Sequence, residues 1–132
     1  MKAQDLLAKA TRAATSAKML LDAGDADGAC NRAYYAMFDA ARAALLASSA
    51  PIEPEIARTH SGLISAFSLN LVKTGRVPLE LGKTLNKAEE LRLVADYKGD
   101  PVEREDAIWV VSQAQTFVHA MENTFLPKSP KQ

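Results

Sequence analysis

Cysteine, histidine and aromatic residues are scarce in this sequence of 132 residues. Cys30 is the single cysteine, so an internal disulfide framework is excluded. Two histidines and one cysteine offer no spacing typical of a metal site, and no glycine-rich phosphate loop or nucleophile elbow is present. We therefore expect neither a metal nor another cofactor.

An excess of either charge is also missing, because 16 Lys and Arg residues balance 16 Asp and Glu residues. Without a net positive field, non-specific binding of nucleic acid is not expected, and any RNA or nucleotide must be held by a local site. No apolar run has the length of a signal peptide or a membrane span. We expect a protein of the reducing cytoplasm with no membrane contact.

Helical periodicity is what the sequence does have. Nearly half of it (48%) is hydrophobic, and alanine and leucine dominate. Apolar residues recur at a spacing of about 3.6 residues in five segments separated by Gly or Pro, approximately residues 3–23, 26–48, 59–75, 78–99 and 100–125. Short connections favour an all-α, antiparallel up-and-down bundle. We predict one domain over residues 1–126 and a disordered tail over residues 127–132.

Two of these helices begin with specific capping signals. Thr59 is a suitable N-cap for the third helix. Asp100, Pro101 and Glu103 place a capping acid, a first-turn proline and a capping-box glutamate in register, which predicts that the fifth helix begins there.

The aromatic residues divide into two groups by their helical spacing. One group lies at core spacing in the second helix, and we expect it to pack inside: Tyr34, Tyr35 and Phe38, together with Met37. Trp109, in contrast, lies about 140° from the apolar stripe of the fifth helix. We expect that side chain to be exposed on a partner or dimer surface.

Arg92 occupies an unusual position in the segment ELRLVADY. On a helical wheel it falls about 40° from the centre of the apolar stripe, so its guanidinium should point inward and needs a partner. Asp96, four residues on, is the expected partner. Tyr97 lies about 140° around from Arg92 and should face elsewhere. The Arg92–Asp96 pair fits an ion pair that closes the helix end as well as it fits a ligand-binding site.

His60 is expected at the same end of the bundle as Arg92, because both lie at similar distances from the turn near Gly75 in an antiparallel hairpin. The end of the second helix and the start of the fifth should reach the same place, bringing Arg42, Ser48 and Arg104 into range. His60 can serve as a structural residue of the helix start or as a contact to phosphate.

Three segments taken together resemble HEPN-domain proteins, the higher-eukaryote and prokaryote nucleotide-binding family, in its small stand-alone prokaryotic branch. They are NRAYYAMFDAARAALL (residues 31–46), RTHSGLISAFSLNLVKTGRVPLELGKTLNKAEELR (residues 58–92) and ADY (residues 95–97). The resemblance implies a helical bundle that forms a homodimer, often beside a minimal nucleotidyltransferase as a toxin–antitoxin pair. Many members are metal-independent ribonucleases with an arginine followed four to six residues later by a histidine, and two such motifs face each other across the dimer.

This sequence departs from that motif. Arg92 matches the motif arginine, but Tyr97, Lys98 and Gly99 stand where the histidine is expected, and Leu93 follows the arginine where a polar residue is common. The hypothesis that His60 takes the place of this histidine is supported by no motif. The role of the catalytic histidine is therefore unassigned.

We interpret the chain as a HEPN protein of a toxin–antitoxin or defence module. It is expected to bind RNA or nucleotide in a dimer cleft that contains Arg92, with Asp96, Tyr97 and Arg42 as further binding residues. Whether it also cleaves RNA is left open by the missing histidine. The alternative is a non-catalytic helical partner or substrate-binding subunit of a minimal nucleotidyltransferase. A third hypothesis makes Tyr97 an acceptor for a nucleotide from that partner.

Overall fold

The computed structural model describes residues 2–53, 55 and 58–126, and within them it contains helices and no strand. The helices are α1 (Ala3–Asp22), α2 (Ala26–Ala47), α4 (His60–Phe67), the π-helical segment η1 (Ser68–Val72), α5 (Leu79–Tyr97) and α6 (Arg104–Phe125). The prediction of an all-α bundle of about five helices is confirmed. The tail predicted to be disordered, residues 127–132, lies outside the described residues.

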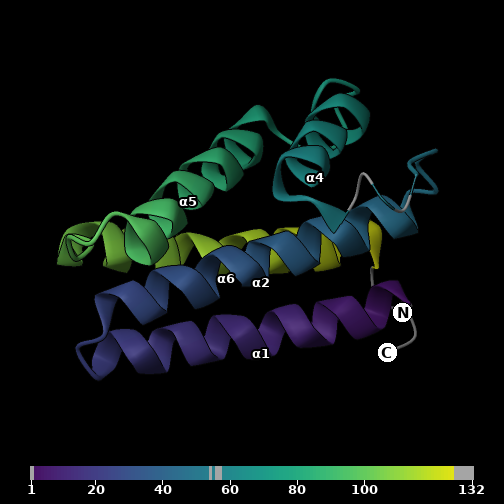
Figure 1. Ribbon diagram of the computed structural model, residues 1–132. Helices are drawn as coiled ribbons and strands as arrows, with labels where there is room; N and C mark the ends of the chain where they lie inside the picture. Colours follow the sequence, from purple (N-terminus) through teal and green to yellow (C-terminus); the bar gives the residue numbers. More distant parts are fainter. Residues whose placement is uncertain (1, 54, 56–57, 127–132) are drawn as a thin grey trace, which may run out of the picture.

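Helix α2 is the centre of the bundle (Figure 1), where α1 runs along one side of it and the α4–α5 pair lies on the other. Helix α6 runs behind α2 and also contacts α1. The turn between α1 and α2 passes through Gly24, whose φ of 90° is a left-handed conformation that glycine adopts without strain. In the described part of the chain, no helix has both the length and the apolar character needed to cross a membrane.

Small side chains let the helices around α2 approach closely. Seven alanines of α2 have at most 1% of their surface exposed: Ala29, Ala33, Ala36, Ala40, Ala41, Ala43 and Ala44. Larger side chains fill the remaining space, among them Tyr34, Met37, Phe67 and Phe117, so the predicted packing role of the α2 aromatics holds for Tyr34 and for Phe38. Burial, with Asp27 and Asp106 nearby, raises the pKa of Cys30 to about 12, so its thiol stays protonated at neutral pH.

One of the two predicted helix starts is confirmed and the other is wrong. Thr59 Oγ1 accepts a hydrogen bond of 3.0 Å from the backbone N–H of Gly62, as an N-cap does. Helix α6 begins only at Arg104, and no side chain caps it. The reason is a long-range contact, since the backbone N–H of Val102 donates to Asp27 Oδ1 at 2.8 Å and the Val102 side chain is buried. This hydrogen bond and the buried Val102 side chain hold the segment before Arg104 against α2, so the predicted capping box does not form.

Trp109 is not the exposed residue that the helical wheel predicts. It is partly buried and packs against the core, whereas the neighbouring Ile108 is 46% exposed. Helix α6 packs against both α1 and α2, so its buried arc is wider than one apolar stripe.

Asp39 is a charged residue in the middle of this apolar packing, with 4% of its surface exposed. Burial raises its pKa above the ordinary value of 3.8, although Lys9, Arg42 and Arg32 oppose the shift. The folded protein therefore binds this proton more tightly than the unfolded chain does. The stabilisation that follows is full below about pH 4 and is lost as the pH rises through the folded pKa.

Replacing Asp39 with Asn should raise the free energy of unfolding at pH 7 by about 1 kcal/mol, because it removes a buried charge. The gain should disappear near pH 3.5. Urea unfolding of wild type and Asp39→Asn at both pH values measures this difference. Asp100→Asn, at an exposed position, is the control and should show no such pH-dependent gain. A variant that is less stable than wild type at pH 7 contradicts the assignment.

Candidate functional site

Arg92 lies inside the bundle, as the helical wheel predicts, with 4% of its surface exposed. Two carboxylates hold its guanidinium. Nε and Nη2 donate to the two oxygens of Glu89 at 3.2 and 3.1 Å, and Nη1 donates to Asp96 Oδ2 at 3.0 Å. Burial by itself would lower the pKa of Arg92, but Glu89, Tyr97 and Asp96 raise it, so the guanidinium stays charged.

Aromatic rings enclose the same guanidinium. Its Cζ lies 5.1 Å from the ring centre of Tyr34 and 6.0 Å from those of Tyr35 and Tyr97, within the range of cation–π attraction. Tyr34 is fully buried, but Tyr97 is 74% exposed. Tyr97 thus faces mostly outward, as predicted, while its ring remains close to Arg92.

The start of α2, rather than its end, completes the cluster. Asn31 Nδ2 donates to both oxygens of Asp96, at 3.2 and 3.3 Å. The expectation that the end of α2 reaches this place is therefore wrong. Helix α4 begins beside Tyr34, in the first half of α2, so the ends of the helices do not line up as they do in a regular up-and-down bundle.

His60 and Arg92 share two neighbours, Tyr34 and Tyr35, which confirms that the two lie in the same region. The Tyr34 hydroxyl and His60 Nδ1 are 2.8 Å apart, and the His60 ring also lies against Tyr35 and Phe38. Burial, with a further contribution from Glu89, raises the pKa of Tyr34, so its phenol remains protonated and can donate to the imidazole. The structure thus gives His60 a packing role through Tyr34, and no contact of His60 with Arg92 is found among the described residues.

Three further predicted neighbours make no contact with Arg92 in the described part of the chain. Arg42 lies about two turns beyond Tyr34 on α2 and lines a separate cavity with Arg58. Ser48 follows the end of α2 and donates to the Leu45 carbonyl at 2.9 Å. Arg104 is the exposed first residue of α6.

Sequence reasoning missed two of the residues that hold Arg92 and Asp96. Glu89 lies three residues before Arg92, a spacing at which helical side chains meet, so its contact could have been found from the same wheel. Asn31 lies 65 residues before Asp96, and no local signal in the sequence joins the two.

The site as it stands is a closed ion-pair cluster. Three of the five N–H donors that a guanidinium has are used by carboxylates. Asp96 holds Arg92 by one bond and its side chain is 25% exposed, whereas Glu89 holds it by two bonds and is 19% exposed. Asp96 is thus the partner that an incoming anion can replace most easily. No group of side chains in the described part of the chain could hold a metal ion.

Comparison with known proteins agrees with the resemblance seen in the sequence. A model of the HEPN domain matches residues 3–124. A UPF0332 protein of Gloeobacter violaceus is 38% identical over 122 residues, which cover 90% of this chain and 93% of the relative. A protein of Methanocaldococcus jannaschii named "Putative toxin MJ0605" is 33% identical over 115 residues, 87% of this chain and 82% of the relative.

Proposed function

The chain belongs to the HEPN-domain family, and from this premise we propose that it is the toxin-type component of a two-component module in the cytoplasm. In this proposal it forms a homodimer and binds RNA along one face of α2, with the Arg92 cluster at the end of that face. Two relatives from Methanocaldococcus jannaschii are named "Putative toxin", which supports the toxin-type role in this proposal.

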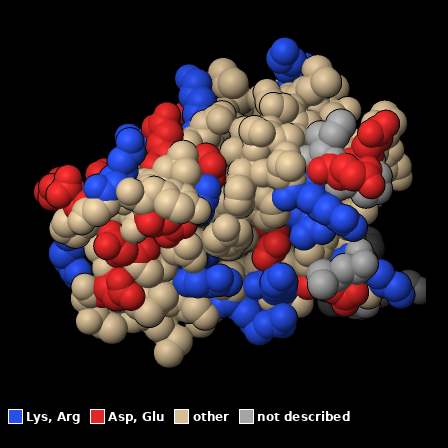
Figure 2. Space-filling view, viewed as in Figure 1, with Lys and Arg blue, Asp and Glu red and all other residues tan. Residues whose placement is uncertain are grey.

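The observation that carries RNA binding is a local group of cations on a molecule of zero net charge. Figure 2 shows Lys and Arg side chains gathered over the lower centre of the view, where α2 and α1 lie, whereas Asp and Glu side chains lie at the left end together with some Lys and Arg, and also at the right. Lys9, Arg32 and Arg42 all act electrostatically on Asp39, so these three cations lie around one point of α2. We call them the basic face. A local cluster of cations is what phosphate backbones bind.

Tyr35 links the basic face to the Arg92 cluster. Its ring centre is 5.9 Å from Arg32 Cζ and 6.0 Å from Arg92 Cζ, and the ring is only partly buried. Because the basic face lies on α2 and Tyr35 joins it to Arg92, RNA is expected to reach Arg92 from the α2 side. A phosphate that arrives there displaces Asp96 from Nη1 while Glu89 keeps its two bonds, so the charge of Arg92 becomes available without the side chain leaving its place.

An apolar surface beside the cluster supports the homodimer. Leu93 is 38% exposed and Tyr97 is 74% exposed, and the two lie one turn apart on α5. Aromatic and apolar residues of this kind are enriched in protein interfaces. A second copy that covers them would place two Arg92 clusters close together.

RNA binding by fluorescence anisotropy in metal-free buffer tests the proposal. Arg32→Gln should weaken binding of a labelled mixed-sequence RNA about fivefold or more, because it removes one phosphate contact. Arg104→Gln makes an equal change of charge in the first turn of α6, next to Glu105 and Asp106, and it should have little effect. Equal affinities of both variants and wild type contradict the proposal. Light scattering that finds only monomers overturns the dimer.

Cleavage is measured on the same RNA by gel analysis. Cutting by wild type that is lost in Arg92→Ala supports a metal-independent nuclease, and no cutting above background leaves binding as the function. If cutting occurs, His60→Ala tests the hypothesis that His60 replaces the missing histidine, which an unchanged rate contradicts.

A second candidate function is that of a non-catalytic partner of a minimal nucleotidyltransferase. Tyr97 favours it, because this residue is 74% exposed and follows Asp96 and precedes Asp100 in the sequence, and acidic surroundings suit a basic protein surface better than they suit RNA. In this case the Tyr97 hydroxyl attacks the α-phosphate of ATP, so that AMP becomes joined to the phenolic oxygen, pyrophosphate leaves and the phenolic proton is lost. The intact mass should then rise by one nucleotide unit after incubation with such an enzyme and ATP, and Tyr97→Phe should abolish the increase. An unchanged mass of the wild-type chain argues against the transfer.

A further inference from the structure

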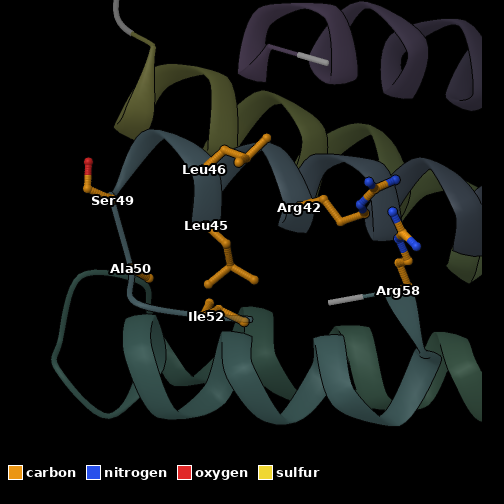
Figure 3. Close-up of a pocket in the computed structure, with 7 residues that line it drawn as sticks. All are labelled: Arg42, Leu45, Leu46, Ser49, Ala50, Ile52 and Arg58. Carbon is orange, nitrogen blue, oxygen red and sulfur yellow. The ribbon is translucent and has the colours of Figure 1, made fainter. Parts of the chain in front are cut away.

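A cavity of about 360 Å³ lies at the far half of α2, away from the Arg92 cluster. The last turns of α2, the segment that follows them and the residue before Thr59 form its walls (Figure 3), with Arg42, Leu45, Leu46, Ser49, Ala50, Ile52 and Arg58 as the lining residues. Its volume is in the lower part of the range of about 300 to 1,000 Å³ typical of small-molecule sites.

The cavity has two chemically different ends. In Figure 3 the side chains of Arg42 and Arg58 point toward one another at one end, and those of Leu45 and Ile52 face each other in the middle. Within the described residues, neither arginine forms an ion pair; Asp39 attracts Arg42 without reaching ion-pair distance. Two neighbouring cations that form no ion pair repel each other, and an anion between them reduces that repulsion.

The remaining wall is aliphatic. Leu45 is buried, whereas Leu46 is 54% exposed, and none of the described lining residues is aromatic. A nucleotide base gains most from stacking on a planar group, and the two guanidinium planes of this cavity lie at its other end, so the aliphatic wall suits a hydrocarbon chain better than it suits a base.

We propose that this cavity binds a small anion with a short aliphatic body, in which a carboxylate accepts hydrogen bonds from Arg42 and Arg58 and the hydrocarbon chain lies against Leu45, Leu46 and Ile52. The site is separate from the Arg92 cluster, but it shares Arg42 with the basic face. Charge-assisted bonds from two arginines fix the head group, and burial of the chain adds affinity.

Octanoate is a suitable probe, with binding measured by calorimetry and the site located by NMR shifts of the Leu45, Leu46 and Ile52 methyl groups. Arg58→Gln, at an exposed position, should weaken binding about tenfold, because it removes a charge-assisted hydrogen bond. Leu46→Asn should weaken it several-fold, and Arg104→Gln should leave it unchanged. Arg32→Gln separates the two sites, since it should lower RNA affinity without changing that for octanoate.

Ligand analogues define the chemistry. Octan-1-ol, without the charge, and inorganic phosphate, without the chain, should each bind at least tenfold more weakly than octanoate. If AMP shifts the same methyl signals and binds more tightly than octanoate does, the site is a nucleotide site and the proposal is overturned. It is also overturned if octanoate moves none of these methyl signals, or if Arg58→Gln binds it as wild type does.

Discussion

Replacing Arg92 with alanine is expected to lower the free energy of unfolding by about 3 kcal/mol, the lower part of the range for breaking a buried ion pair. The reason is that Glu89 and Asp96 lose their shared cation while their side chains remain only 19% and 25% exposed. Two neighbouring carboxylates then repel each other with no counter-charge. Urea unfolding at neutral pH measures the loss.

Two further variants separate charge from packing in this result. Arg92→Met keeps most of the apolar stem, and it should still lose at least about 2 kcal/mol, because the carboxylates remain unpaired. In a background that carries Glu89→Gln and Asp96→Asn, Arg92→Ala should cost only about 1 kcal/mol. Arg104→Ala, at an exposed position, should stay within about 0.5 kcal/mol of wild type. If the cost of Arg92→Ala is the same in both backgrounds, the carboxylates are not its cause.

Phe117→Ala should have the largest effect on stability, a loss of about 4 kcal/mol. Phe117 is fully buried on α6, and its ring centre lies 5.6 Å from that of Phe67 at the end of α4. Truncation opens a cavity in the layer that joins the α4–α5 pair to the rest of the bundle. Because domains of this size are stable by only about 5 to 15 kcal/mol, much of the fold's stability would be lost.

The same measurement on a surface residue of α6 provides the control. Ile108→Ala removes a large apolar side chain that is 46% exposed, and it should cost no more than about 1 kcal/mol. Thermal unfolding followed by circular dichroism suffices for both variants. Similar losses for Phe117→Ala and Ile108→Ala would contradict the core placement of Phe117.

Features that depend on one helix could be predicted from the sequence. The inward position of Arg92 and its pair with Asp96 follow from a rotation of about 100° per residue, and they are observed. The Thr59 cap follows from local hydrogen-bond chemistry in the same way. All-α architecture follows from the apolar period, which no strand pattern contradicts.

Features that depend on how helices meet could not be predicted. The capping box at Asp100 fails because Val102 bonds to Asp27, 75 residues earlier in the chain. Asn31 reaches Asp96 because the start of α2, not its end, lies beside the end of α5. Trp109 is partly buried because α6 contacts two helices. Each of these contacts joins positions that no local period relates.

Asp96 is the residue that occupies the Arg92 site of this chain, which lacks the motif histidine. Asp96, rather than a histidine, closes the Arg92 site, and it does so with a carboxylate that competes for the same N–H donor as a phosphate oxygen does. Arg92 is therefore held in position by Glu89 and covered by Asp96. In the proposed function, an RNA phosphate binds Arg92 by replacing the Asp96 carboxylate at Nη1.

The RNA affinity of Asp96→Asn tests this claim most directly. The amide removes the competing charge, while Asn at this position can still accept a hydrogen bond from Asn31. Asp100→Asn makes the same change of net charge at an exposed position a few residues away and serves as the matched control. The account predicts that Asp96→Asn binds RNA about tenfold more tightly than wild type does, with little change for Asp100→Asn. Equal or weaker binding by a folded Asp96→Asn protein would contradict it.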